Sequence, residues 1–238
     1  MMRFDSEHDL LVIPDVHGRG FWREALDLPH WSHVLFLGDY TDPYSYEHIS
    51  VQQAYDNFVE IIGYALNHPS QTTLLLGNHD MHYKSDIFRR HAKGSRYSSM
   101  MAPAYAQLFD TYDHLFSLAF EAEYEGERCL FTHAGVVPKW YASHAPLIGD
   151  LTAENLNRLA QSDEGMTALA DVGWSRGGFA RAGGPLWADC SEMSALEDGP
   201  YQIFGHTQNY DDRAVITSHY ACVDTHRGYL LSEILAGR

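Results

Sequence analysis

The chain has 238 residues, of which 45% are hydrophobic and 20% are charged, and its formal net charge is −16 at pH 7. This length and apolar content fit one large α/β domain with a sizeable core better than two small domains, so we expect a single domain over residues 1–238. The acidic balance argues against general binding to nucleic acids or anionic membranes, because both require a basic protein surface.

The cysteines and the N-terminal segment predict a soluble, cytoplasmic protein. Cys129, Cys190 and Cys222 are odd in number and widely spaced, so they form neither a CxxC motif nor a disulfide framework. The first residues, MMRFDSEHDLL, carry charges where a signal peptide requires an apolar segment. No stretch approaches the roughly 18 apolar residues of a membrane-spanning helix. We therefore expect a reducing compartment and no membrane association.

Short apolar runs alternate with amphipathic segments in the first part of the chain. The runs over 9–14, 33–37 and 72–76 are each bounded by Gly, Asp or Pro, which is typical of buried strands. The segments 21–28 and 50–66 lie between them, and the second has apolar residues at helical spacing. Strand, helix, strand, helix, strand is the order of a parallel βαβ sheet.

The second part of the chain predicts further strands around one helical segment. Two runs, 118–124 and 128–132, flank the sequence Glu125-Gly126-Glu127, which indicates a hairpin turn. Residues 150–170 are predicted to be helical, and 171–184 are predicted to form a Gly-rich loop with two arginines. Late short strands are predicted over 202–204, 214–217, 220–223 and 229–234. One α/β domain with a mixed, two-sheet core is the simplest interpretation.

Asp, Asn and His side chains follow five of the predicted strands, each time close to a glycine. A glycine there lets the backbone turn sharply and approach a bound ion or phosphate. Because strand ends in open α/β sheets meet at one crevice, we expect these groups at one site. Each motif alone also fits a turn, a helix cap or a hydrogen-bonded histidine, but their joint occurrence favours a site. The motifs are Asp15 and His17 in DVHG, Asp39 and Asp42 in GDYTD, Asn78, His79 and Asp80 in GNHD, His133 in THAG, and His206 in FGHT.

In this order the five motifs resemble the calcineurin-like metallophosphoesterase superfamily. The resemblance is closest to the phosphoprotein-phosphatase branch, including its bacterial and phage members. The Asp three residues after Asp39, the final GHT and the late segment CVDTHRGYLL support that branch, although His226 stands where Gly is usual. The resemblance implies a four-layer α/β/β/α sandwich, in which two packed mixed β-sheets are flanked by helices.

The resemblance also implies a role for each motif residue. Two divalent metal ions would activate a bridging water for direct attack on a phosphate ester, and Asp39 would bridge the two ions. The oxygen and imidazole donors suit Mn²⁺ first, with Fe or Zn²⁺ as alternatives. His79 would protonate the leaving group, oriented and kept charged by Asp42. The remaining metal ligands would be Asp15 and His17 on the first ion and Asn78, His133 and His206 on the second.

Two departures from the family pattern concern the substrate. Phosphoprotein phosphatases continue the second motif with a phosphate-binding arginine, whereas Pro43 follows Asp42 in this chain. Arg176 in the WSRGG loop is the candidate replacement and Arg181 is the second choice, the alternative being a solvated loop arginine. Gln208 stands where many phosphodiesterases of the superfamily have another metal-binding histidine. This departure favours monoester substrates unless the Gln208 amide oxygen also binds metal.

The sequence leads us to expect a phosphomonoesterase that acts on phosphoproteins or small phosphate esters. The segment GGPLWAD resembles a loop near the metals of protein phosphatases, so Asp189 could support a ligand histidine; the alternative is a loop anchored by a buried Trp187. A phosphodiesterase or dinucleoside-polyphosphate hydrolase remains an alternative function, and so does a non-catalytic binding module with the same fold. The sequence leaves the oligomeric state open.

Overall fold

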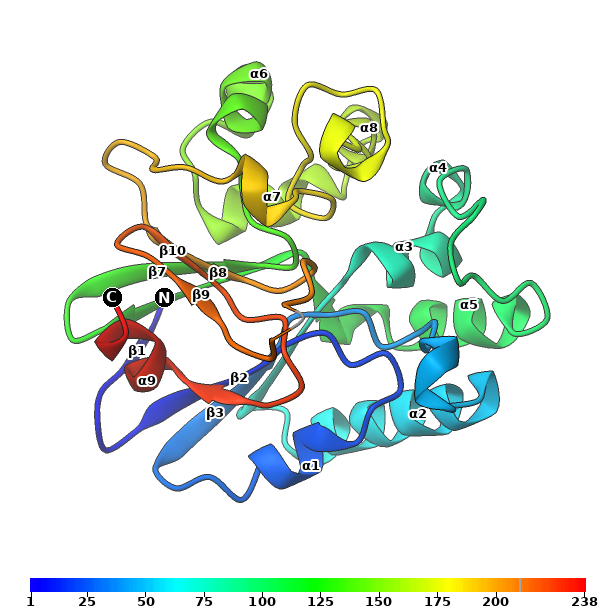
Figure 1. Cartoon of the computed structure of the whole chain (residues 1–238), viewed down its shortest axis with the longest axis horizontal. Helices are drawn as coiled ribbons and strands as arrows, with labels where there is room; N and C mark the ends of the chain where they lie inside the picture. The colour runs from blue at the N-terminus through cyan, green and yellow to red at the C-terminus, as the bar shows by residue number, and fades with distance from the viewer. Residues whose placement is uncertain (210) are drawn as a thin grey trace.

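The computed structural model describes residues 1–209 and 211–238, which fold as two mixed β-sheets flanked by helices (Figure 1). This arrangement confirms the predicted α/β sandwich. The two sheets pack against each other through one layer of apolar side chains, and a second, larger apolar cluster lies between the sheets and the outer helices. In Figure 1, α1 and α2 lie on one side of the sheets and α6, α7 and α8 lie on the other.

The first sheet carries the predicted βαβ repeat. Its elements are β2 (Asp9–Ile13), α1 (Phe21–Ala25), β3 (Trp31–Phe36), α2 (Val51–Asn67), β4 (Thr72–Leu75), β5 (Phe116–Ser117) and β11 (Tyr229–Leu230). The strand order is β11-β2-β3-β4-β5, in which β2 to β5 are parallel and β11 is antiparallel to β2. Helix α2 begins at a capping box formed by Ser50 and Gln53, which satisfies backbone N–H groups at its first turn.

The second sheet contains the predicted hairpin. Its strands are β1 (Met2–Phe4), β6 (Ala119–Tyr124), β7 (Glu127–Thr132), β8 (Tyr201–Phe204), β9 (Val215–Ile216) and β10 (Tyr220–Cys222). They follow the order β1-β6-β7-β8-β10-β9, and β6 and β7 are antiparallel. Glu125 and Gly126 have φ of 49° and 91°, the left-handed backbone that a two-residue hairpin turn requires.

Strand β2 shows why both faces of the first sheet are apolar. Successive strand side chains point to opposite faces. Leu10 and Val12 therefore join the layer between the sheets, where Phe131 of β7 also lies. Leu11 and Ile13 point the other way and join the cluster beneath the helices. A strand that is buried on both faces has a continuous run of apolar residues, and this run is the pattern from which β2 was predicted.

Two of the predicted elements differ from the structure. Residues 150–170 form two helices, α7 (Ala153–Leu159) and α8 (Asp163–Leu169), because Ser162 caps a new helix by accepting a hydrogen bond from the Gly165 N–H at 3.0 Å. The predicted strand over 229–234 is wrong beyond Leu230. Helix α9 (Leu231–Ala236) begins there, and the Asp9 carboxylate accepts a hydrogen bond from the Ser232 N–H at 3.3 Å. A short apolar run fits either structure, so periodicity could not separate them.

The remaining helices complete the outer layers and the rim of the site. They are α3 (Asn78–Lys84), α4 (Asp86–Arg89), α5 (Ala102–Thr111) and α6 (Pro138–Ile148). Among the helices of the described ranges, none has both the length and the apolar character needed to cross a bilayer.

Candidate metal centre

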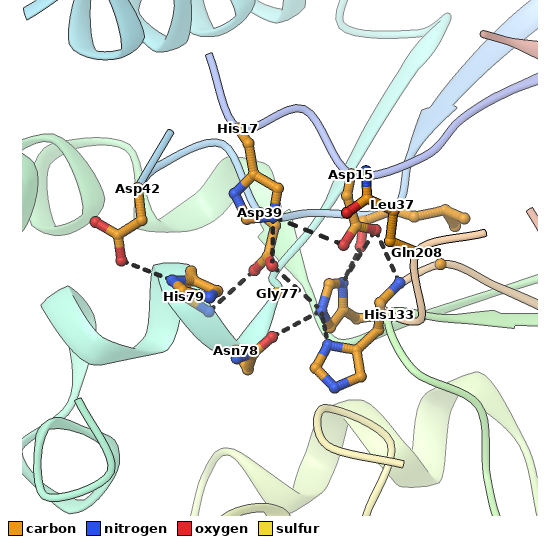
Figure 2. A network of polar contacts seen from close by, with 12 residues as sticks. Asp15, His17, Leu37, Asp39, Asp42, Gly77, Asn78, His79, His133 and Gln208 are labelled. Atoms are coloured by element: carbon orange, nitrogen blue, oxygen red, sulfur yellow. Dashed lines mark hydrogen bonds and ion pairs between the residues drawn. The ribbon is translucent and has the colours of Figure 1, made fainter. Parts of the chain in front are cut away.

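The polar motifs of the sequence come together where strands from both sheets end. Figure 2 shows their side chains facing a common centre. One sheet contributes the residues that follow β2, β3 and β4, and the other contributes those that follow β7 and β8. The structure thus brings together Asp15, His17, Asp39, Asp42, Asn78, His79, His133 and His206, all buried except His206, which is partly buried.

Several of these side chains sit on strained backbone. Non-glycine residues rarely adopt positive φ, and such residues persist where surrounding structure holds them. The φ values are 45° for His17, 54° for Asp39, 56° for Asp42 and 65° for His206. This conformation turns the chain sharply after each strand, so that the side chains point back to the sheet edge.

Asp80 holds the turn that carries Asp39. Its buried carboxylate accepts hydrogen bonds from the backbone N–H groups of Asp39 at 2.8 Å, Gly77 at 2.9 Å and Tyr40 at 3.0 Å. Gly77 lies so close that a Cβ there would be 2.1 Å from Asp39 Oδ1. Asp80 and Gly77 therefore fix the Asp39 carboxylate from behind, and Gly77 cannot be replaced by a larger residue without moving it.

Replacing Asp80 with alanine is expected to lower the free energy of unfolding by roughly 3–5 kcal/mol, because each buried donor left unpaired costs about 1–3 kcal/mol. Urea denaturation of the metal-free protein measures this effect. Asp86→Ala is the control, since the Asp86 side chain is 86% exposed and its loss should cost no more than about 0.5 kcal/mol. Equal unfolding midpoints for the two variants would contradict the bracing role of Asp80.

The first cluster of possible metal ligands consists of Asp15, His17 and Asp39. His17 Nε2 lies 3.3 Å from Asp39 Oδ2 and 4.0 Å from Asp15 Oδ2. His17 Nδ1 is 2.9 Å from the Thr41 carbonyl oxygen; a carbonyl can only accept, so Nδ1 carries the hydrogen. Burial lowers the pKa of His17 well below its ordinary value. The imidazole is therefore neutral, with its Nε2 lone pair facing the two carboxylates, as a metal ligand requires.

The second cluster combines Asp39 with His133 and His206. His133 Nε2 lies 3.0 Å from Asn78 Oδ1, 3.1 Å from His206 Nδ1 and 3.6 Å from Asp39 Oδ2. His133 Nδ1 is 2.9 Å from the carbonyl oxygen of Leu37, so this ring too presents Nε2 to the cluster. Four possible ligand atoms thus surround one point, and Asp39 contributes to both clusters.

The charge balance of the centre fits bound cations. Burial raises the pKa of Asp39 to about 7; the charge of His79 opposes this rise, and the neighbouring Asp15 carboxylate adds to it. His206 presents Nδ1 to the second cluster, 3.1 Å from His133 Nε2. Carboxylate, amide and imidazole donors without thiolates suit Mn²⁺, Fe or Zn²⁺ at a catalytic site, whereas structural zinc sites rely on cysteine.

The chain matches the family model of calcineurin-like phosphoesterases over residues 8–210. It belongs to this family. Family members usually use two divalent metal ions, and the two clusters that share Asp39 offer groups for them. The match supports a hydrolase that acts on phosphorylated substrates. A search of curated proteins found no match.

The comparison with solved structures includes one phosphatase that shares this fold. A cold-active protein tyrosine phosphatase is 16% identical, with a TM-score of 0.50, and the alignment covers 100% of this chain and 73% of that one. At this identity the likeness concerns the fold alone. A protein serine/threonine phosphatase from Saccharomyces cerevisiae is 21% identical with a TM-score of 0.32, covering 57% of this chain and 42% of that one.

His79 lies at the edge of the centre and contacts Asp42. Its Nδ1 donates a hydrogen bond of 2.7 Å to Asp42 Oδ2, and the Tyr83 hydroxyl donates to the other oxygen of Asp42. The His79 backbone N–H donates to Asp39 Oδ1 at 2.9 Å. The ring meets that of His17 edge-on at 5.2 Å between centroids. His79 Nε2 is not used in these contacts and lies 3.3 Å from Arg96 Nη2.

Arg176 and Asp189, both singled out in the sequence, pair with each other. Arg176 Nε lies 3.0 Å from Asp189 Oδ2, and Arg176 Nη2 donates to Thr207 Oγ1 at 2.7 Å and to the His206 carbonyl oxygen at 3.3 Å. Within the described residues Asp189 makes no hydrogen bond to a histidine ring. Arg181 is exposed.

A cleft of about 610 Å³ adjoins the centre at His206. Gln208 lies in it, where its Oε1 accepts a hydrogen bond of 3.4 Å from the Tyr46 hydroxyl and its Nε2 is 3.3 Å from His226 Nε2. The cleft is lined by Tyr44, Tyr46, Arg176, Asp189, His206, Thr207, Gln208, Asn209, Asp212 and His226. Among the proposed metal ligands, His206 is the one that lines this cleft.

Sequence reasoning missed the roles of Asp80 and Tyr83 and the position of Arg96. Asp80 and Tyr83 lie on α3, the helix that also carries Asn78 and His79. His79 and Tyr83 are four residues apart, a spacing that places both on one face of a helix, so the sequence did contain a signal for Tyr83. Arg96 lies in the segment KGSRYSS, which has no motif. Only the fold shows that its guanidinium reaches the centre, with Nη2 at 3.3 Å from His79 Nε2.

Proposed function

We propose that this chain is a single-domain phosphomonoesterase, similar to serine/threonine phosphatases, that depends on two metal ions. The observation that carries the proposal is the pair of ligand clusters sharing Asp39, with the His79–Asp42 pair beside them. A resemblance to the bacterial and phage phosphoprotein phosphatases is part of this proposal. The substrate would be a phosphoprotein or a small phosphate ester.

Each residue of the centre has a defined role in the proposal. When bound, two divalent cations, Mn²⁺ first and Fe or Zn²⁺ as alternatives, would supply the Lewis acidity that activates water and neutralises phosphate charge. Asp39, which belongs to both clusters, would be a ligand of both ions. The other ligands would be Asp15 and His17 for one ion and Asn78, His133 and His206 for the other.

His79 is the proposed general acid. In the hydrolysis, the oxygen of water forms a bond to phosphorus as the ester P–O bond breaks, and the leaving oxygen takes the proton from His79 Nε2. The attacking water keeps one hydrogen on the new phosphate oxygen and releases the other proton to solvent, and solvent returns a proton to His79. The products are an alcohol and hydrogen phosphate. Asp42 fixes the ring by accepting the hydrogen bond from Nδ1, so the acidic Nε2–H stays aimed at the site.

Monoesters are favoured over diesters by the surroundings of Gln208. Its amide contacts Tyr46 and His226 rather than the groups of the first ligand cluster. The first cluster therefore has three protein side chains in our proposal, in line with the departure at Gln208 from the phosphodiesterase pattern. A phosphodiesterase or a dinucleoside-polyphosphate hydrolase is the alternative function, and the presence of the His79–Asp42 pair opposes a non-catalytic binding module.

The test compares p-nitrophenyl phosphate with bis-p-nitrophenyl phosphate in the presence of Mn²⁺, each with an EDTA control. We expect faster cleavage of the monoester and loss of both activities with EDTA. Faster cleavage of the diester would favour the phosphodiesterase alternative. Activity that survives complete metal removal would contradict the metal-dependent mechanism, and metal binding without hydrolysis of any phosphate ester would favour the binding module.

A further inference from the structure

Arg96 reaches the metal centre from a loop between α4 and α5. Its guanidinium packs over the ring of Tyr44, with Cζ 3.6 Å from the ring centroid, and Arg96 Nε donates a hydrogen bond of 2.9 Å to the Asp42 carbonyl oxygen. Two residues later, the Ser98 N–H donates to the Tyr83 hydroxyl at 2.9 Å. The loop is therefore attached at two points to the groups around Asp42, and the guanidinium is held in one orientation.

The free end of this guanidinium points between two imidazoles of the centre. Arg96 Nη2 lies 3.3 Å from His17 Nε2 and 3.3 Å from His79 Nε2. The first atom belongs to a ligand cluster, and the second is the nitrogen proposed to donate the proton. A phosphoryl group that contacts both the metal ions and His79 must pass within reach of Arg96 Nη2.

Arg96 is also the arginine of the centre whose charge has no carboxylate partner among the described side chains. The other arginines nearby are neutralised: Arg176 pairs with Asp189 at 3.0 Å, and Arg19 pairs with Glu47 at 2.8 Å. Arg96 is held by the ring of Tyr44 and a backbone carbonyl, and neither group forms a salt bridge with its guanidinium. An unpaired, oriented guanidinium is suited to bind a tetrahedral oxyanion.

We propose that Arg96, rather than Arg176, binds the phosphoryl group of the substrate. The inference rests on the proposed function, and it names the residue that supplies the guanidinium missing at Pro43. Because Arg96 Nε binds the carbonyl of Asp42, its guanidinium lies at the same corner of the site as Pro43. By holding phosphate oxygens, Arg96 orients the ester oxygen toward His79 Nε2.

The test measures the binding of inorganic phosphate to Mn²⁺-loaded protein by isothermal titration calorimetry. Arg96→Gln is expected to weaken phosphate binding roughly 10–100-fold, the range for a charge-assisted hydrogen bond to an anion. Arg96→Lys keeps the charge without the planar fork and should fall between wild type and Arg96→Gln. The matched control is Arg90→Gln, an exposed arginine shortly before the same loop, which should bind phosphate as wild type does.

The outcomes separate this inference from the proposed function. Wild-type protein that neither binds phosphate nor cleaves esters would overturn the proposed function, and the inference with it. Phosphate binding by wild type with equal affinity for Arg96→Gln and Arg90→Gln would overturn the inference alone, as would a larger loss in Arg176→Gln. The metal content of Arg96→Gln and Arg96→Lys is measured by mass spectrometry, and we expect both variants to retain two ions. Loss of metal from both variants would overturn the inference, because it would show that Arg96 maintains the metal site instead.

Discussion

Replacing Asp39 with asparagine is expected to empty the metal centre and to lower hydrolysis by about 10³-fold or more. Asp39 is the one residue that belongs to both ligand clusters, at 3.3 Å from His17 Nε2 and 3.6 Å from His133 Nε2. Asparagine keeps the shape of the side chain and an acceptor for the His79 N–H, but it removes the negative charge that the two ligand clusters share. Metal ions stabilise the transition state by several kcal/mol, and an energy of this size corresponds to the expected loss of hydrolysis rate.

Inductively coupled plasma mass spectrometry after dialysis gives the metal content of the Asp39→Asn variant. We expect clearly fewer than two ions per chain. Asp56→Asn is the matched control: Asp56 is exposed on α2 and accepts a hydrogen bond from Gln52, so this variant should retain wild-type metal content and activity. If Asp39→Asn kept both ions at wild-type affinity, Asp39 would not be the shared ligand.

Replacing His79 with asparagine is expected to lower turnover by roughly 10²–10⁴-fold while both metal ions remain bound. A general acid typically accelerates a reaction by about this factor. The metal ions should remain bound because His79 is not among the proposed ligands. The loss should be largest for substrates with a poor leaving group, because an alkoxide needs a proton more than p-nitrophenolate does. Turnover of O-phosphoserine and of p-nitrophenyl phosphate, measured side by side, gives this dependence.

The control for His79 is His68→Asn, which alters an exposed histidine whose ring packs against Tyr64. It should behave as wild type with both substrates. Equal turnover of O-phosphoserine by wild type and His79→Asn would remove His79 from the role of general acid. A uniform loss with both substrates, accompanied by loss of metal, would instead show that the substitution had disturbed the neighbouring Asn78.

Much of the fold could be predicted because its signals are local. Strands β2, β3 and β4 are short apolar runs buried on both faces, and α2 has helical spacing and a capping box. The hairpin of β6 and β7 was marked by one Gly-containing turn. The strand assigned over 229–234 failed where Asp9, distant in the sequence, caps α9. No local pattern carries that information.

The sequence by itself determined the family and the positions of the ligand candidates. Three of the motifs follow strands whose direction the βαβ order implies, so their convergence could be expected before any coordinates. The packing of the two sheets brings the motifs after β7 and β8 to the same place. The tertiary structure decided how the charges around that site are paired. Asp80 binds the Asp39 turn from 41 residues away, and Arg96 binds Asp42 from 54 residues away. Such long-range contacts depend on how loops pack, which neither composition nor periodicity records.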